Sequence, residues 1–146
     1  MPDFRRFCEA QAPVWNQVLR ELRAGRKSGH WMWFIFPQLL GLGHSRAAQF
    51  YALASIEEAD AYLREPVLGA RLRECTRLVN ETQGRTIEEI FGHPDDLKFH
   101  SCMTLFARAG TLGEASAENQ VFRAALKQYF GGREDPRTLE LLGQQG

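Results

Sequence analysis

Residues 30–43 read HWMWFIFPQLLGLG, and the prediction of the fold starts from this segment. Residues 31–36 are six consecutive apolar side chains, and Pro37 ends the run. The run is far shorter than the ~20 apolar residues that a membrane-spanning helix needs. Because it is apolar on every side, neither a surface helix nor a strand with one exposed face would bury it. We therefore predict a buried central segment at residues 30–40, with helices packed around it.

Length and composition indicate one globular domain over residues 1–146. Hydrophobic residues make up 44% and charged residues 25% of the chain, which is close to the average for soluble domains. The first ten residues, MPDFRRFCEA, include acidic residues and lack the apolar region of a secretory signal. We expect a cytoplasmic protein that does not associate with membranes.

The cysteines and histidines show no metal-ligand spacing. Cys8, Cys75 and Cys102 contain no C-x-x-C pair, and the four histidines form no H-E-x-x-H motif. We expect neither a metal ion nor another cofactor. The cysteines are interpreted as small buried apolar residues in a reducing compartment.

Charge is balanced overall but unevenly distributed. Residues 1–50 carry seven Lys and Arg against three Asp and Glu, and residues 51–100 carry six against ten. The net charge of zero argues against general nucleic-acid binding, which requires an excess of basic residues. The basic first third, together with Trp31 and Trp33, leaves nucleic acid as the third hypothesis for a ligand.

Composition and end signals favour helices over strands. Ala and Leu total 33 residues, whereas Val, Ile and Thr total 15. Ser55 and Thr86 are each followed three residues later by Glu, the signature of a capping box. On the helix predicted over residues 13–24, Glu21 is expected on the exposed face. The other predicted helices and turns cover residues 3–7, 31–36, 45–54, 55–64, 66–82, 86–92, 94–109, 116–130 and 135–142, with a loop at 110–115. The predicted fold is all-α: a single compact multi-helix domain.

Several blocks of the sequence carry a resemblance to a known family. They are SGHWMWFIFPQL at 28–39, GLG at 41–43, PVLG at 66–69 with Arg71 and Leu72, IFG at 90–92, PDDLKF at 94–99, SCMTLF at 101–106 and YFGG at 129–132. On these blocks the chain resembles the bacterial family catalogued as domain of unknown function 1810. The resemblance implies a compact all-helical fold and supplies no activity, because the family is uncharacterised. Some relatives carry the label calpastatin, but calpastatin inhibitory segments are disordered repeats, and this chain has neither repeats nor a disordered composition.

The first candidate site is the glycine turn GLGHSR at residues 41–46. A turn containing Gly41 and Gly43 that leads into a helix exposes backbone N–H groups, which suit a phosphate or a carboxylate. Arg46 stands where the dinucleotide fingerprint requires a third glycine, and no Walker-type lysine follows. An ordinary turn with Ser45 as the helix N-cap explains the same residues, and both interpretations remain open.

The second candidate is the basic loop at residues 26–31, RKSGHW, which places cations beside indoles. Such a pairing can hold an anion while a planar ring stacks on the indole. The alternative is a solvated basic loop that leads into the core, with Trp31 and Trp33 as core residues.

The third candidate is the start of the helix at residues 94–109. Asp96 and His100 are four residues apart and can pair on a helix, and such a pair would suit acid–base catalysis. Alternatively, Asp95 and Asp96 stabilise the helix dipole and form surface ion pairs. Lys98 lies between Leu97 and Phe99 and is predicted to project from the edge of the core into a cleft.

Together these candidates predict a pocket for an anionic small molecule, either a phosphate-bearing or a planar metabolite. The residues expected to line it are His30, Trp31, Trp33, Gly41, Gly43, Ser45 and Lys98. If the protein is an enzyme, His30, Asp95 and Asp96 are the first acid or base candidates. The alternative hypothesis is a protein–protein interaction module without catalysis.

Overall fold

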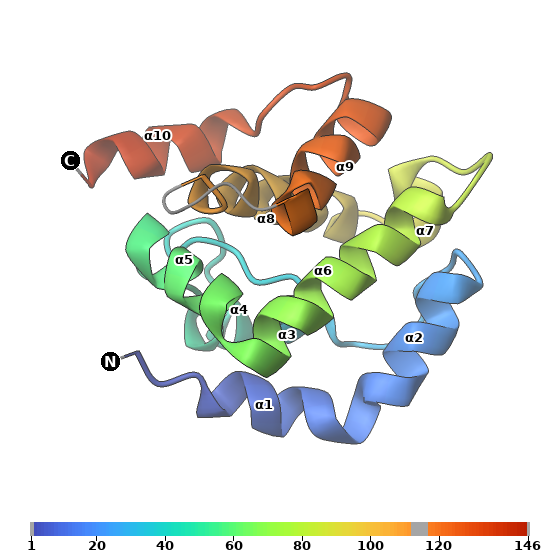
Figure 1. Cartoon of the computed structure of the whole chain (residues 1–146), viewed down its shortest axis with the longest axis horizontal. Coiled ribbons are helices and arrows are strands. Elements are labelled where there is room, and N and C mark those ends of the chain that lie inside the picture. The colour runs from blue at the N-terminus through green and yellow to red at the C-terminus, as the bar shows by residue number, and fades with distance from the viewer. Residues whose placement is uncertain (1, 112–116, 146) are drawn as a thin grey trace.

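The aromatic segment, which includes helix α3, lies among the other helices in the computed structural model, which describes residues 2–111 and 117–145 (Figure 1). The helices are α1 (Arg5–Gln11), α2 (Trp15–Arg23), α3 (Met32–Ile35), α4 (Arg46–Phe50), α5 (Ile56–Arg64), α6 (Pro66–Glu81), α7 (Ile87–Phe91), α8 (Asp95–Ala109), α9 (Gln120–Phe130) and α10 (Pro136–Gln144). Short 3₁₀ helices, Ala12–Val14 and Ala117–Asn119, precede α2 and α9. The predicted all-α fold is confirmed.

The aromatic segment lies in the core, as predicted. Trp31 is 1% exposed, and Phe36 is completely buried. Phe36 packs edge to face against Phe91 and Phe99, with ring centroids 5.5 and 5.2 Å apart. The segment forms the single helical turn α3, which stops before Pro37 because proline disfavours helical geometry in the preceding residue.

Helix α8 is the central element of the domain. It packs against α5, α7, α9 and α10, and most of its second half is buried. Helix α6 packs against α2, α5 and α9. In Figure 1, α10 lies along one edge of the view, close to α8, and α1 lies along the opposite edge.

Side-chain caps set several helix ends where the sequence predicted them. Ser45 Oγ accepts the N–H of Ala48 at 3.1 Å, and Ser55 Oγ accepts the N–H of Glu58 at 3.1 Å. Thr86 and Glu89 form the complete reciprocal capping box that starts α7. These caps satisfy backbone donors that the first turn of a helix leaves unpaired.

The helix predicted over residues 45–54 is shorter in the structure, because α4 ends at Phe50. Beyond it, the N–H of Leu53 donates to the carbonyl of Gln38 at 2.9 Å, and Leu53 accepts the N–H of Leu40 at 2.8 Å. This isolated bridge between Leu39 and Leu53 is the only β-pairing in the described residues. It holds the loop that follows α3 against the body of the domain.

Three further predictions can be compared with the structure. Cys75 and Cys102 are buried as expected, and Cys8 is partly buried. Most of the loop predicted at residues 110–115, and Ser116 at the start of the next predicted helix, lie outside the described residues. Within the described part of the chain, no helix combines the length and apolarity needed to cross a membrane.

Candidate functional site

A cleft of about 310 Å³ opens between the loop that follows α3, the first turns of α8 and the start of α10. This volume is at the lower end of the range for small-molecule pockets. Its walls combine apolar side chains with charged and hydrogen-bonding groups. The lining residues are Gln38, Leu42, Gly43, Pro94, Leu97, Lys98, His100, Ser101, Asp135 and Arg137.

The glycine turn forms one wall of the cleft. Gly41 has φ +107°, in the region that favours glycine, and its Cα lies beside the side chain of Leu141 on α10. A Cβ atom on Gly43 would approach the Cβ of Ala48 to 2.6 Å, so the chain needs glycine there to fold back onto α4. Ser45 is used as the cap of α4, which agrees with the interpretation of an ordinary turn.

The start of α10 forms the opposite wall and is fixed to α8 by Asp135. Asp135 Oδ2 accepts hydrogen bonds from the N–H of Thr138 at 3.1 Å and from the hydroxyls of Thr138 and Ser101 at 2.6 and 3.0 Å. The N–H of Asp135 donates to Thr104 Oγ1 at 2.8 Å. These contacts place Arg137, in the first turn of α10, at the cleft.

Lys98 belongs to a network of two lysines and one carboxylate. Its Nζ atom lies 3.0 Å from Asp95 Oδ1, and Lys27 Nζ lies 2.8 Å from Asp95 Oδ2. The side chain of Lys27 is only 8% exposed. Partial burial raises the pKa of Asp95, but the hydrogen bonds and charges of both lysines outweigh it and lower this pKa overall. Asp95 therefore stays ionised near neutral pH and is a weak proton acceptor.

The lysines of this network also cover the two indoles. Lys98 Nζ lies 5.2 Å from the ring centroid of Trp33, and Lys27 Nζ lies 5.2 Å from that of Trp31. The predicted pairing of cations with indoles is present, but it is formed within the protein. Trp31 is buried, so its ring face is not open to a stacked ligand, whereas Trp33 is partly exposed.

Glu21 fixes the loop that carries Lys27, although the sequence placed this carboxylate on an exposed face. That expectation is wrong, because the chain after α2 folds back over it. Its oxygens accept the N–H groups of Ser28 and Gly29 at 2.7 and 2.9 Å. They also accept Gln17 Nε2 at 2.8 Å and Trp31 Nε1 at 3.0 Å. Burial raises the pKa of Glu21, but these four hydrogen bonds outweigh it and lower the pKa to about 2.

The predicted pair of Asp96 with His100 is wrong. Asp96 Oδ1 lies 3.0 Å from Nδ1 of His93, within the chain that starts α8. His100 instead faces the end of α9. Its Nε2 donates to the carbonyl of Arg133 at 2.8 Å, and its ring stacks on Phe130 with centroids 3.9 Å apart and planes 7° apart. Packing against α9 therefore decides which way the imidazole points.

The structure brings together some of the predicted site residues and separates others. Gly43 and Lys98 line the cleft, and Trp33 lies beneath the ammonium group of Lys98. His30 is exposed and Ser45 caps α4; neither lines this cleft.

The sequence analysis did not identify four polar residues of the cleft: Gln38, Ser101, Asp135 and Arg137. Asp135 begins the helix predicted over residues 135–142, and in the structure it is the N-cap of α10. Nothing local to residues 135–137 indicates that they meet α8, because that contact depends on the tertiary fold.

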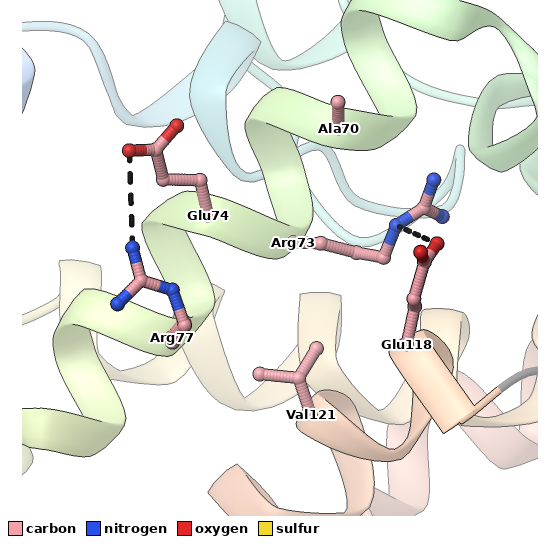
Figure 2. A pocket seen from close by; sticks show the side chains of 6 residues that line it. All are labelled: Ala70, Arg73, Glu74, Arg77, Glu118 and Val121. Carbon is pink, nitrogen blue, oxygen red and sulfur yellow. Dashed lines mark ion pairs between the residues drawn. The ribbon is translucent and has the colours of Figure 1, made fainter.

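A second cleft, of about 510 Å³, lies between α6 and the segment that starts α9 (Figure 2). Its charged side chains pair with one another: Arg77 lies 3.9 Å from Glu74, and Arg73 lies 3.7 Å from Glu118. Arg73 also donates to Asn119 Oδ1 at 3.1 Å. Because these guanidinium groups are already paired with carboxylates, this cleft is expected to attract an anionic ligand less strongly than the cleft at Lys98. Ala70 and Val121 complete its lining.

No metal site accompanies either cleft in residues 2–111 and 117–145. Within these ranges, no three His, Cys, Asp or Glu side chains lie close enough together to hold a metal ion.

Comparison with known proteins places the chain among proteins of similar sequence and fold. The family model described as a protein of unknown function, DUF1810, matches residues 1–142. The crystal structure of a conserved hypothetical protein from Mycobacterium tuberculosis is 60% identical, with a TM-score of 0.89, over 95% of each chain. No curated protein matches the chain significantly. These similarities establish the fold, but they do not indicate an activity.

Proposed function

Since the chain belongs to DUF1810, a family of unknown function, we propose a function from the chemistry of its cleft. We propose that the protein binds a small molecule that carries an anionic group, such as a phosphate, together with an apolar or planar part. The cleft at Lys98 is the binding site.

The observation that carries this proposal is the unbalanced charge of the Lys27–Asp95–Lys98 network. Two ammonium groups share one carboxylate, and neither lysine has another ion-pair partner among the described residues. One carboxylate balances only one of the two ammonium charges, so the network keeps a net positive charge at the wall of the cleft, which attracts an anion from solution. Lys98 is the lysine of the pair that lines the cleft.

The other walls are compatible with such a ligand. The side chain of Arg137 forms no hydrogen bond or ion pair within the described residues, so its guanidinium group is available to an oxyanion at the cleft. Leu42, Pro94 and Leu97 supply an apolar surface, and the side chain of Leu97 is largely exposed. Burial of this surface under a flat ligand would add to the electrostatic attraction.

The proposal is tested by calorimetric titration with adenosine 5′-monophosphate, which has both an anionic and a planar part, and with inorganic phosphate. We expect the wild-type protein to bind the nucleotide, and K98M to bind it at least about tenfold more weakly. Methionine keeps the length of the side chain and removes its charge. The matched control is K127M, which removes an exposed lysine of α9 away from the cleft.

Tryptophan fluorescence locates the ligand in the same titration. Binding beside Lys98 should change the emission of Trp33, and W33F should lose most of that change. A folded K98M that binds as tightly as the wild type would overturn the proposal. Failure of the wild type to bind either the nucleotide or inorganic phosphate would overturn it as well.

A further inference from the structure

His100 has a defined tautomer when its ring is neutral. Nε2 lies 2.8 Å from the carbonyl oxygen of Arg133. A carbonyl oxygen can only accept a hydrogen bond, so Nε2 must carry the hydrogen. In the neutral ring, Nδ1 is therefore a bare acceptor, and protonation of His100 converts that same atom into a donor.

Nδ1 has no partner within the described residues, although the rest of the ring is held firmly. Phe130 covers one face of the imidazole, and Nε2 is bonded to Arg133. His100 lines the cleft together with Lys98 and Arg137. The free edge and the free face are the parts of the ring that remain for a ligand.

A second unused acceptor lies in the same cleft. Asp135 uses Oδ2 for its three bonds to Ser101 and Thr138, and Oδ1 accepts no hydrogen bond within the described residues. The cleft therefore combines cationic donors with two groups that can accept a hydrogen bond from the ligand. An anion whose oxygens carry no hydrogen cannot donate to these acceptors, so covering them costs binding free energy.

We propose that His100 makes the cleft selective for anions that carry a hydrogen-bond donor next to the charge. The donor is a P–O–H group or a neighbouring hydroxyl, and it bonds to Nδ1. This inference rests on the proposed function, and it narrows the ligand from any anion to this class. Hydrogen phosphate belongs to the class, and sulfate does not.

The charged and titratable groups around His100 come from every element that packs on it. Lys98 lies on α8 itself, Asp135 and Arg137 lie at the start of α10, and Arg133 follows α9. His44 lies on the loop after α3, next to the lining residue Gly43. His44 is the other imidazole near the cleft, so it is tested together with His100.

The experiment compares sulfate with inorganic phosphate by calorimetry. At about pH 8, where phosphate keeps one hydrogen and sulfate has none, we expect phosphate to bind at least about tenfold more tightly than sulfate.

The decisive variant is H100Q. The glutamine amide can still donate to the carbonyl of Arg133, but it has no acceptor at the position of Nδ1. We expect H100Q to bind phosphate and sulfate with similar affinity at about pH 8, because the acceptor that favours phosphate is gone. The controls H93Q and H44Q should keep the preference for phosphate over sulfate, because His93 pairs with Asp96 and neither residue lines the cleft.

The outcomes separate this inference from the proposed function. Selectivity that persists in H100Q, or that disappears in H44Q, overturns the role of His100 while anion binding stands. Binding of neither oxyanion and no nucleotide overturns both. If H100Q does not fold, nitrogen NMR of the wild-type imidazole replaces it: added phosphate should shift the Nδ1 resonance of His100, and an unchanged resonance overturns the inference.

Discussion

Glu21 shows how one buried carboxylate organises a loop that is otherwise rich in cations. Its two oxygens accept four hydrogen bonds, two of them from consecutive backbone N–H groups. The loop 24–31 is consequently fixed rather than solvated throughout, and Lys27 is presented to Asp95. The sequence pattern of α2 did not predict this, because the residues that bury Glu21 follow the helix and are not part of its periodicity.

We expect E21Q to lower the free energy of unfolding by about 3 kcal/mol at neutral pH. The pKa of Glu21 falls from its usual 4.5 to about 2 on folding, so its stabilisation is present above about pH 4.5 and is lost as the pH falls toward 2. Urea unfolding at about pH 7 and about pH 3 should therefore show a smaller difference between E21Q and wild type in acid.

The control for this measurement is E140Q, which changes an exposed carboxylate on α10 and should leave stability nearly unchanged. An equal deficit of E21Q at both pH values would show that shape, and not ionisation, explains its effect.

At the scale of elements, the junction of α5 and α6 depends on Gly69. A glycine inside a helix normally costs stability. Here a Cβ atom would overlap the backbone carbonyl of Leu63, at the end of α5. The absence of a side chain therefore allows the two helices to meet closely across Glu65, whose side chain accepts the N–H of Leu68 at 2.7 Å.

We expect G69A to lower the free energy of unfolding by about 3 kcal/mol, because the overlap involves backbone and cannot be relieved by a rotamer change. The same substitution at Gly143, in α10, meets open space and should be neutral or slightly stabilising. Chemical denaturation of both variants checks this. Equal effects of G69A and G143A would contradict the packing explanation and leave only helix propensity.

Helices were the most predictable elements, because their signals are local. Ser45, Ser55 and Thr86 cap the helices that the sequence assigned to them. The length of α4 was not predictable, because Leu53 leaves helical geometry to pair with the loop near Leu39, a contact between distant segments.

At the scale of the whole molecule, a chain of aromatic rings connects the core to the cleft. Phe36 and Phe91 pack on Phe99, and the ring centroids of Phe99 and Phe130 are 6.3 Å apart. The imidazole ring of His100 in turn stacks on Phe130. The position of the imidazole therefore depends on packing that begins in the central segment.

We expect F99L to lower the free energy of unfolding by about 1–3 kcal/mol, because it opens a space between completely buried rings. F50L, which changes a phenylalanine that is 58% exposed, should cost much less. Thermal and urea unfolding of both variants test this. A comparable loss in both would mean that the ring chain does not dominate the core.

The candidate site was only partly predictable, because it also depends on contacts between segments that are far apart in the sequence. Lys98 was identified because a cation between two apolar neighbours stands out in the sequence, and Gly43 because glycine turns do. Arg137 and Asp135 are ordinary residues until α10 docks on α8. A single sequence contains no rule that joins residues 38–43, 94–101 and 135–137 into one cleft.

The hydrogen bonds of Asp135 with Ser101 and Thr104 have a consequence for partly folded molecules. An intermediate with α10 detached would retain both lysines and their shared carboxylate, yet its ligand would meet a single wall. Ligand capture would thus distinguish the finished molecule from such an intermediate even when both show the same helical content by circular dichroism.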